Sequence, residues 1–159
     1  MGNIQIKTLD KNNALHVAEV TRLFADYYMY FHELGIDLPL IPNGEIIWMQ
    51  SVLPSLDRLA CLPVAVMEEH IIGFAHGSIK LLPSYLGENK VGVVQHVYVP
   101  QAHTGMGIAR RLVETLENWF DQKQVHSIEL QVIRGNTNAA LFWKKLGYHT
   151  ELEQFRKIL

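Results

Sequence analysis

Residues 95–116, QHVYVPQAHTGMGIARRLVETL, decide the fold, because they join a strand to a helix through a loop with two glycines. The strand pattern stops at Pro100, and apolar residues recur at every fourth position from Ile108 onward, which is typical of a helix. Gly105 and Gly107 let the backbone turn tightly and approach a ligand closely. The first N–H groups of a helix lack partners and carry partial positive charge, so this loop is a candidate cradle for a diphosphate. A plain strand-to-helix turn is the alternative, and the loop by itself does not decide between the two.

Working outward from this loop, hydrophobic periodicity predicts one α+β domain over residues 1–159, with α/β order in its C-terminal half. Upstream we expect a strand at residues 4–9 and then a long helix that begins at Asp10 or Asn12. A second helix at residues 44–53, a strand hairpin at residues 61–67 and 71–82, and a further strand at residues 91–99 should follow. Downstream of the helix that begins at Ile108 we expect a strand, a helix and a last strand, at residues 127–133, 136–146 and 148–159. The strands that flank the helix at Ile108 should lie parallel in one sheet, joined by a right-handed crossover.

The composition excludes several classes of protein. Apolar residues make up 48% of the chain and charged residues 19%, which is ample for one buried core. The net charge of −2 argues against a general nucleic-acid binder, which needs a basic face. No apolar stretch approaches the ~20 residues that a membrane-spanning helix needs. Cys61 is the single cysteine and cannot form an internal disulfide. We therefore expect a cytoplasmic protein that binds neither nucleic acid nor membranes.

The glycine loop fits neither of the two commonest phosphate-binding motifs. A dinucleotide fingerprint needs a small residue where this chain has Arg110, and a P-loop needs a lysine that is missing here. The loop resembles motif A of the GNAT acetyltransferase superfamily, in which Arg/Gln-x-x-Gly-x-Gly/Ala follows a strand and begins a helix. In this chain the motif falls on Thr104, Gly105, Met106, Gly107, Ile108 and Ala109.

A second stretch, NTNAALFWKKLGY at residues 136–148, strengthens the resemblance. GNAT proteins often carry Asn-x-x-Ala-x-x-φ-Tyr-x-x-φ-Gly-Phe/Tyr there, where φ is apolar. The matching residues are Asn136, Ala139, Phe142, Trp143, Leu146, Gly147 and Tyr148. The resemblance implies an acetyl-CoA-binding core at residues 61–159 and a variable acceptor-side region at residues 1–60. It also implies a GNAT-like mixed central sheet of six to seven strands with about four helices, splayed at the central parallel pair.

The resemblance assigns roles to residues of both stretches. It implies an N-acetyltransferase that moves the acetyl group of acetyl-CoA to a primary amine by direct attack in a ternary complex. The acceptor would be a small molecule or a peptide, and a homodimer is common among similar proteins. Acetyl-CoA would contact the strand, the glycine loop and the last helix, through Val97, Tyr98, Val99, Thr104, Gly105, Met106, Gly107, Ile108, Ala109, Arg110, Asn136, Phe142 and Trp143.

Two residues depart from the family pattern. Thr104 stands where Arg or Gln is usual, and Trp143 stands where the family has the Tyr that protonates the leaving thiolate. An indole N–H donates hydrogen bonds but does not release a proton at useful pH. Tyr98, a water, or unassisted departure of the thiolate are the alternatives. The rival hypothesis is therefore a non-catalytic acyl-CoA-binding or sensor module, and a third is an acidic-pocket binding protein whose glycine loop is only a turn.

Candidates for the remaining roles come from the same strand and from the first helix. His96 suits a general base because an unperturbed imidazole titrates near neutrality, although a half-buried histidine bonded to backbone is the simpler interpretation. His76 is the second choice. The candidate acceptor-binding residues are Tyr27, Tyr28, Phe31 and Gln95, with ordinary core packing as the alternative for the aromatic ones. No cysteine pair or zinc-helix motif is present in the sequence, so we expect no metal.

Overall fold

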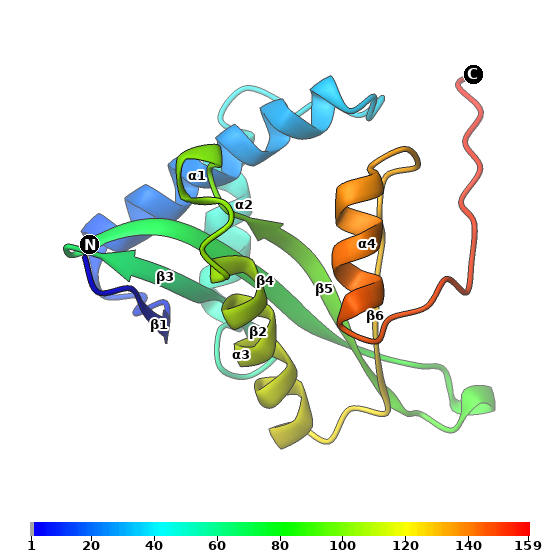
Figure 1. The fold of residues 1–159 in the computed structure, drawn as a ribbon. Helices are drawn as coiled ribbons and strands as arrows, with labels where there is room; N and C mark the ends of the chain where they lie inside the picture. Colours follow the sequence, from blue (N-terminus) through cyan, green and yellow to red (C-terminus); the bar gives the residue numbers. More distant parts are fainter. Residues whose placement is uncertain (1) are drawn as a thin grey trace.

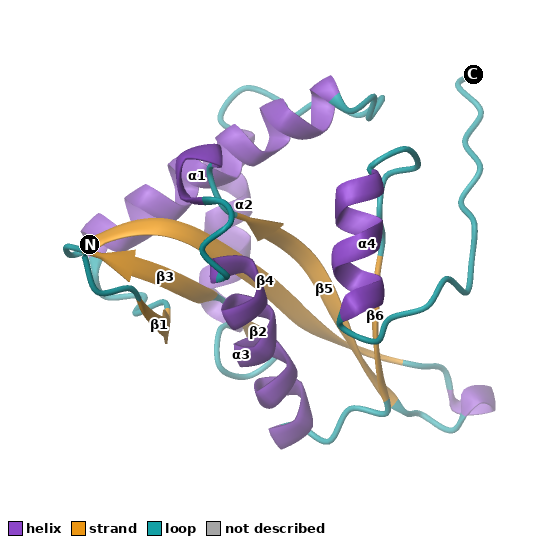
Figure 2. Cartoon of the chain, in the orientation of Figure 1, coloured by secondary structure: helices purple, strands orange, loops and turns teal. Residues whose placement is uncertain are grey.

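The computed structural model describes residues 2–159 and arranges them as a mixed sheet with helices on both faces (Figure 1, Figure 2). The six strands run β1-β3-β4-β5-β6 across the sheet, with the short β2 also paired to β4. Only the β5–β6 pair is parallel among the named strands of residues 2–159. The strands are β1 Gln5–Thr8, β2 Ala60–Cys61, β3 Pro63–Met67, β4 His70–Leu81, β5 Lys90–Tyr98 and β6 Ser127–Leu130. The helices are α1 Ala14–Glu33, α2 Gly44–Val52, α3 Ile108–Gln122 and α4 Thr137–Lys145, with single 3₁₀ turns η1 Leu53–Ser55, η2 Ser84–Leu86 and η3 Gln101–His103.

The mixed sheet of six strands with four α-helices confirms the predicted fold class. The start of α1 differs from the prediction, because Asn13 is the N-cap and accepts a hydrogen bond from the backbone N–H of His16 at 3.1 Å. Asp10 instead closes a turn just before the helix, where its carboxylate accepts from the N–H of Asn12 at 2.9 Å. The sequence offers three capping residues in a row of four, and local spacing alone does not distinguish them.

The hairpin of β3 and β4 is confirmed, with a turn of two residues. Glu68 and Glu69 have φ of 50° and 68°, both in the left-handed region, as a type I′ turn requires. This turn twists the two strands in the sense that the sheet needs. The predicted strand 61–67 is divided at Leu62 into β2 and β3, which pair with β4 in one register until an irregularity between Ala65 and Val66.

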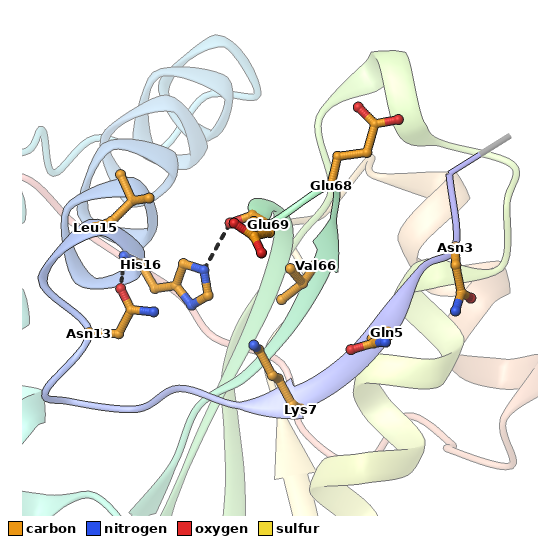
Figure 3. A pocket seen from close by; sticks show the side chains of 9 residues that line it. All are labelled: Asn3, Gln5, Lys7, Asn13, Leu15, His16, Val66, Glu68 and Glu69. Atoms are coloured by element: carbon orange, nitrogen blue, oxygen red, sulfur yellow. Dashed lines mark hydrogen bonds between the residues drawn. The ribbon is translucent and has the colours of Figure 1, made fainter.

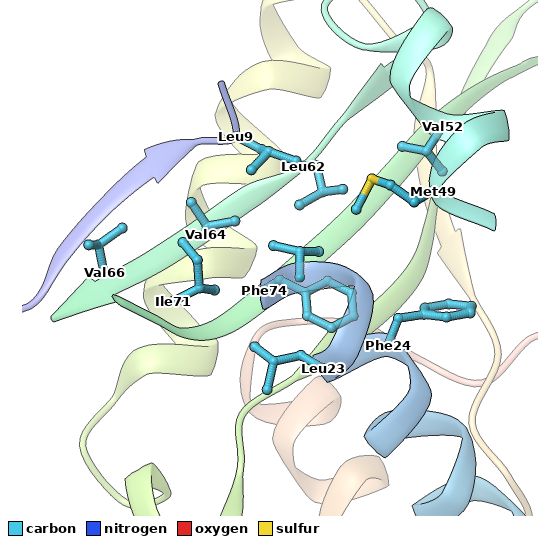
Figure 4. Packing of buried hydrophobic residues seen from close by; sticks show 11 residues of the cluster. Leu9, Leu23, Phe24, Met49, Val52, Leu62, Val64, Val66, Ile71 and Phe74 are labelled. Carbon is cyan, nitrogen blue, oxygen red and sulfur yellow. The ribbon is translucent and has the colours of Figure 1, made fainter. Parts of the chain in front are cut away.

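Two hydrophobic layers hold the helices against the sheet. One layer lies under α1 and α2 and includes Phe24, Met49 and Phe74 (Figure 4). The other lies under α3 and α4, and α3 buries its residues Ile108, Leu112, Val113, Leu116 and Phe120 there. A Cβ on Gly92 would lie 2.8 Å from the Phe120 ring, so glycine at this position lets α3 pack closely on β5.

The predicted last strand at residues 148–159 is wrong. Residues 151–159 are exposed, have no regular structure, and run beside α4 away from the sheet (Figure 1). Gln131 donates a side-chain hydrogen bond to Gln154 at 3.0 Å, but no backbone bond ties residues 151–159 to the rest of the described chain. A strand needs a neighbour for its backbone N–H and C=O groups, and this segment has none.

Among residues 2–159, none of the helices combines the length and the apolar character that a membrane span requires.

Candidate active site

A β-bulge in β5 sets the geometry of the site. His76 on β4 lies opposite His96, while the next pair is Gly77 with Val94, so Gln95 is one extra residue in β5. The bulge shifts the alternation of side chains along the strand. Val94 therefore faces α3 and α4, whereas His96 faces α1 and α2. The side-chain nitrogen of Gln95 donates to the Ser78 hydroxyl at 2.8 Å on the exposed side.

The parallel strands separate directly beyond the bulge. Pairing of β5 with β6 ends at Val94 and Leu130, although β5 continues to Tyr98 and stays paired there with β4. Residues 95–98 therefore keep one backbone edge free on the side of β6, and Figure 1 shows the two strands diverging there. This confirms the predicted splay at the parallel pair.

The glycine loop begins where β5 ends and presents unpaired amides. Gly105 and Gly107 have φ of 78° and 73°, which glycine adopts without strain, and Gly107 is the N-cap residue of α3. A Cβ at either glycine would meet no atom within 4 Å, so the space in front of the loop is open. Within residues 2–159 no hydrogen bond takes up the amide N–H groups of residues 105–110. A row of free N–H groups at the positive end of a helix fits a diphosphate.

The polar side chains around this loop have partners inside the protein. The Thr104 hydroxyl donates to the Gln101 carbonyl at 2.8 Å. The Arg110 guanidinium pairs with Glu114 at 2.8 Å, and Arg111 donates to the carbonyl of Ile4 at 3.0 Å. Anion recognition at the loop therefore falls mainly to backbone amides, including those of Met106 and Ala109. Ile108 is 1% exposed, so only its backbone faces a ligand.

Most of the predicted coenzyme residues of β5 and α4 come together on one side of the sheet, whereas Tyr98 faces the other side. Val97, Val99, Phe142 and the buried Trp143 belong to the same hydrophobic cluster under α3 and α4. Trp143 packs edge-on against the rings of Phe142 and Tyr148, at centroid distances of 5.0 and 5.1 Å. The side-chain oxygen of Asn136 caps α4 by accepting from the N–H of Ala139 at 3.2 Å, which leaves its NH₂ group to donate.

The opposite side of the sheet carries the predicted acceptor residues. An aromatic enclosure surrounds His96, with Phe24, Tyr27 and Trp48 all perpendicular to the imidazole, at centroid distances of 5.0 to 5.7 Å. Trp48 and Phe24 stack face to face at 3.8 Å. Further aromatic contacts tie Tyr28, Phe31 and Tyr98 to the enclosure. Gln95 lies outside it, because the bulge directs its side chain toward Ser78.

Sequence reasoning missed Trp48. It lies on α2 and reaches His96 only because residues 34–43 fold α2 back beside α1, which no local pattern predicts. The buried Nε1 of Trp48 has no hydrogen-bond partner within residues 2–159. A buried N–H without a partner is costly in a core and useful where a ligand supplies the acceptor.

Burial controls the ionisation of the site. The pKa of His96 is lowered to about 3 by burial, with a further lowering from His76. Burial likewise lowers the pKa of His76 to about 4. Both imidazoles are therefore neutral at physiological pH, which differs from the near-neutral pKa expected for His96 from the sequence alone. Burial raises the pKa of both Tyr27 and Tyr98, and the negative charge of Asp26 raises the pKa of Tyr98 further. Neither phenol therefore ionises.

Two other features of the described residues lie outside this site. A surface pocket of about 450 Å³ lies between β1, the β3–β4 turn and the start of α1, where His16 donates to the carbonyl of Glu69 at 2.9 Å (Figure 3). None of its lining residues belongs to the predicted coenzyme or acceptor set. Burial raises the pKa of the Cys61 thiol to about 12, so this cysteine is a packing residue and not a nucleophile.

Comparison with known proteins agrees with the family resemblance seen in the sequence. The model of the acetyltransferase (GNAT) family matches residues 18–148. An aminoglycoside N-acetyltransferase, AAC(6')-Iy in complex with CoA, superimposes with a TM-score of 0.77 at 17% identity, covering 99% of this chain and 96% of that one. A ribosomal-protein-alanine N-acetyltransferase from Brucella melitensis biovar Abortus 2308 gives a TM-score of 0.67 at 19% identity, covering 99% and 100%. A transcriptional regulator from Bacillus halodurans gives 0.76 at 17% identity, covering 99% and 100%. A comparison of the sequence with curated proteins finds no significant match.

Proposed function

Because the chain belongs to the acetyltransferase (GNAT) family, whose enzymes are acyltransferases, we propose that it moves the acetyl group of acetyl-CoA to a primary amine by direct attack within a ternary complex. The observation that carries the proposal is the free backbone edge of residues 95–98, which leads directly into the free amides of residues 105–110. A pantetheine arm pairs with such an edge, and its diphosphate binds at the start of a helix. We place the coenzyme on this path, with Val97 and Phe142 beside it and the NH₂ group of Asn136 donating to it.

The two faces of β5 divide the reaction between coenzyme and acceptor. Val97 and Val99 face the cluster under α3 and α4, whereas His96 and Tyr98 face the aromatic enclosure. The thioester carbonyl would lie at the free edge between them, where a backbone N–H stabilises the negative charge that develops on its oxygen. A neutral amine on the His96 side would then attack the carbonyl carbon.

Proton transfer follows the attack. As the N–C bond forms, the amine nitrogen gains positive charge and becomes more acidic, and its proton passes to the neutral His96 imidazole. The C–S bond then breaks and CoA leaves as a thiolate, which takes up the proton through water. Trp143 cannot supply that proton, since an indole N–H is not an acid at useful pH. A thiol with a pKa of about 8.5 is a good enough leaving group to depart without a side-chain acid.

The acceptor that we propose is an amine with an apolar or cationic body. Aromatic faces at Tyr28 and Phe31 are half-buried and lie beside the enclosure, where they can hold such a group. The enzymes similar in structure are named for an aminoglycoside and for the alanine of a ribosomal protein, so both a small molecule and a peptide are acceptors to test. The reducing cytoplasm and a homodimer stay predictions.

Thiol release in an amine panel tests the proposal. The purified protein is mixed with acetyl-CoA and with sisomicin, a peptide that begins with alanine, or simple diamines, and free thiol is measured. We expect one class to raise thiol release well above the rate with acetyl-CoA alone. Titration calorimetry with acetyl-CoA serves as the control. Binding without release for any amine would favour the acyl-CoA-binding module, whose specific support is Trp143 at the position of the usual acid. No binding at all would leave a protein of the GNAT fold that does not use this coenzyme.

His96→Ala is expected to lower kcat for the accepted amine on the order of a hundredfold, near the lower end of what a general base contributes, because the buried imidazole is a weak base. The KM for acetyl-CoA should change little, since His96 faces away from the coenzyme side. In both proteins kcat/KM should fall as pH falls below the pKa of the amine, because an ammonium ion has no lone pair for attack. A fall of kcat/KM between about pH 8 and about pH 6 that is absent in His96→Ala would contradict this assignment, because it would show that the pKa of His96 is near neutrality.

A further inference from the structure

His76 and His96 form one hydrogen-bonded unit at the bulge. Their Nδ1 atoms lie 3.1 Å apart, and the two ring planes differ by 10° with centroids 5.3 Å apart. That centroid separation is close to the N···N distance plus two ring radii. The rings therefore meet edge to edge and nearly in one plane, so a single proton lies almost on the line between the facing nitrogens.

Such a contact requires opposite tautomers. Burial keeps both rings neutral at physiological pH, so one Nδ1 carries hydrogen and donates while the other accepts with its lone pair. If His96 donates, its Nε2 carries the lone pair and can accept a proton. If His96 accepts, its Nε2 carries hydrogen and cannot act as a base. The hydrogen bond to His76 thus decides whether His96 has any catalytic use.

We infer that His76 is a positioning residue, which accepts the hydrogen bond of His96 Nδ1–H and thereby holds the His96 Nε2 lone pair toward the acceptor amine. The assignment rests on the proposed function. Relative exposure fits this division of roles, because His76 is 4% exposed whereas His96 is half-buried, so the His96 ring is the one that can meet a substrate. When His96 takes up the amine proton, the bond to His76 becomes charge-assisted and stronger.

The surroundings leave His76 without a competitor for this role. The groups that pack on the His96 ring from α1 and α2 are Phe24, Tyr27 and Trp48, which meet it at right angles and make no hydrogen bond with it. No carboxylate bonds to either imidazole within residues 2–159. The tautomer of His96 is therefore set by a neutral histidine, in the place where other enzymes use an aspartate.

Nitrogen NMR of protein labelled with ¹⁵N-histidine tests the tautomer directly and does not depend on catalysis. Long-range ¹H–¹⁵N correlation at neutral pH is expected to show His96 with hydrogen on Nδ1 and His76 with hydrogen on Nε2, assigned with the single variants. The opposite pair of tautomers, or a charged ring, would overturn the inference. If no amine in the panel accepts an acetyl group, the proposed function fails, but the NMR measurement still determines the tautomers of His76 and His96.

Two substitutions at position 76 separate positioning from packing. His76→Asn keeps an acceptor at the δ position, and we expect it to retain the Nδ1–H tautomer of His96 and kcat within about threefold. His76→Leu removes the acceptor and should lower kcat about tenfold to a hundredfold, with the acetyl-CoA KM unchanged. His16→Leu is the matched control, because His16 is also buried but bonds to Glu69 far from β5; it should alter neither readout. Equal losses of kcat in both His76 variants, with the His96 tautomer unchanged, would mean that His76 only packs.

Discussion

Gly107→Val is expected to weaken acetyl-CoA binding at least about a hundredfold while the protein remains folded. Two effects act in the same direction. Gly107 has φ of 73°, where a β-branched residue is strained, so valine would rotate the loop and misdirect its free amides. The new side chain would also enter the open space in front of the loop, in which no atom now lies within 4 Å of a Cβ. Loss of two charge-assisted hydrogen bonds of about 1.5–3 kcal/mol each accounts for the magnitude. Titration calorimetry with acetyl-CoA measures it.

Gly35→Val is the matched control for this experiment. Gly35 follows α1, has φ of 97°, and likewise has space for a Cβ with no other atom within 4 Å, so valine there is also strained but does not touch the glycine loop. We expect Gly35→Val to lose stability to a similar extent and to keep its affinity for acetyl-CoA. Normal affinity in Gly107→Val would place the diphosphate elsewhere, and equal loss in both variants would assign the effect to strain alone.

The glycine loop shows what local sequence can predict. Pro100, Gly105 and the periodic apolar residues from Ile108 act through backbone dihedrals and burial within a few residues of one another, so the strand, the loop and α3 follow from the sequence. The splay of the parallel pair is implied only by the family resemblance, and the structure confirms it.

The acceptor side was predictable only in part. Tyr27, Tyr28 and Phe31 lie close to one another because they share one long helix, and the family resemblance implies an acceptor pocket beside it. Trp48 joins them through a tertiary contact that no local pattern predicts. The bond between the two histidines depends on the bulge at residue 95, because without the extra residue a different side chain would lie opposite His76. Register of this kind is a property of two strands together, and neither strand encodes it alone.

The strand predicted after α4 is wrong for a related reason. Residues such as Leu152 and Phe155 have the strand propensity that suggested a last strand, yet they are 84% and 86% exposed. Propensity reflects how a side chain fits a half-buried sheet surface, and it has no effect where no neighbouring strand provides that surface.

The buried histidine pair is also expected to make the protein sensitive to acid. In the unfolded chain both histidines titrate near the ordinary value of 6.5, whereas in the folded protein burial lowers the pKa of His76 to about 4 and that of His96 to about 3. Between these values the unfolded state binds protons that the folded state does not bind. The free energy of unfolding must therefore fall as pH falls below about 6.5, by up to about 1.4 kcal/mol per pH unit for each histidine.

Urea unfolding at about pH 7 and about pH 4.5 should therefore differ by about 3 kcal/mol or more, a large part of the 5–15 kcal/mol that stabilises a typical domain. The comparison stops at about pH 4.5 because, at lower pH, protonation of the Glu19 carboxylate would add a second loss of stability. Burial would raise the pKa of this carboxyl, but hydrogen bonds from His70 and from the backbone of Ile71 bring it below its ordinary value, so its stabilising charge is lost only below that range.

In the double variant His76→Leu/His96→Leu the pair is replaced by apolar side chains of similar size, so most of this pH dependence should disappear while stability at neutral pH is largely kept. Identical pH dependence in the wild type and the double variant would show that the two imidazoles take up protons as readily in the folded state as in the unfolded state, which would contradict the lowered pKa of the pair.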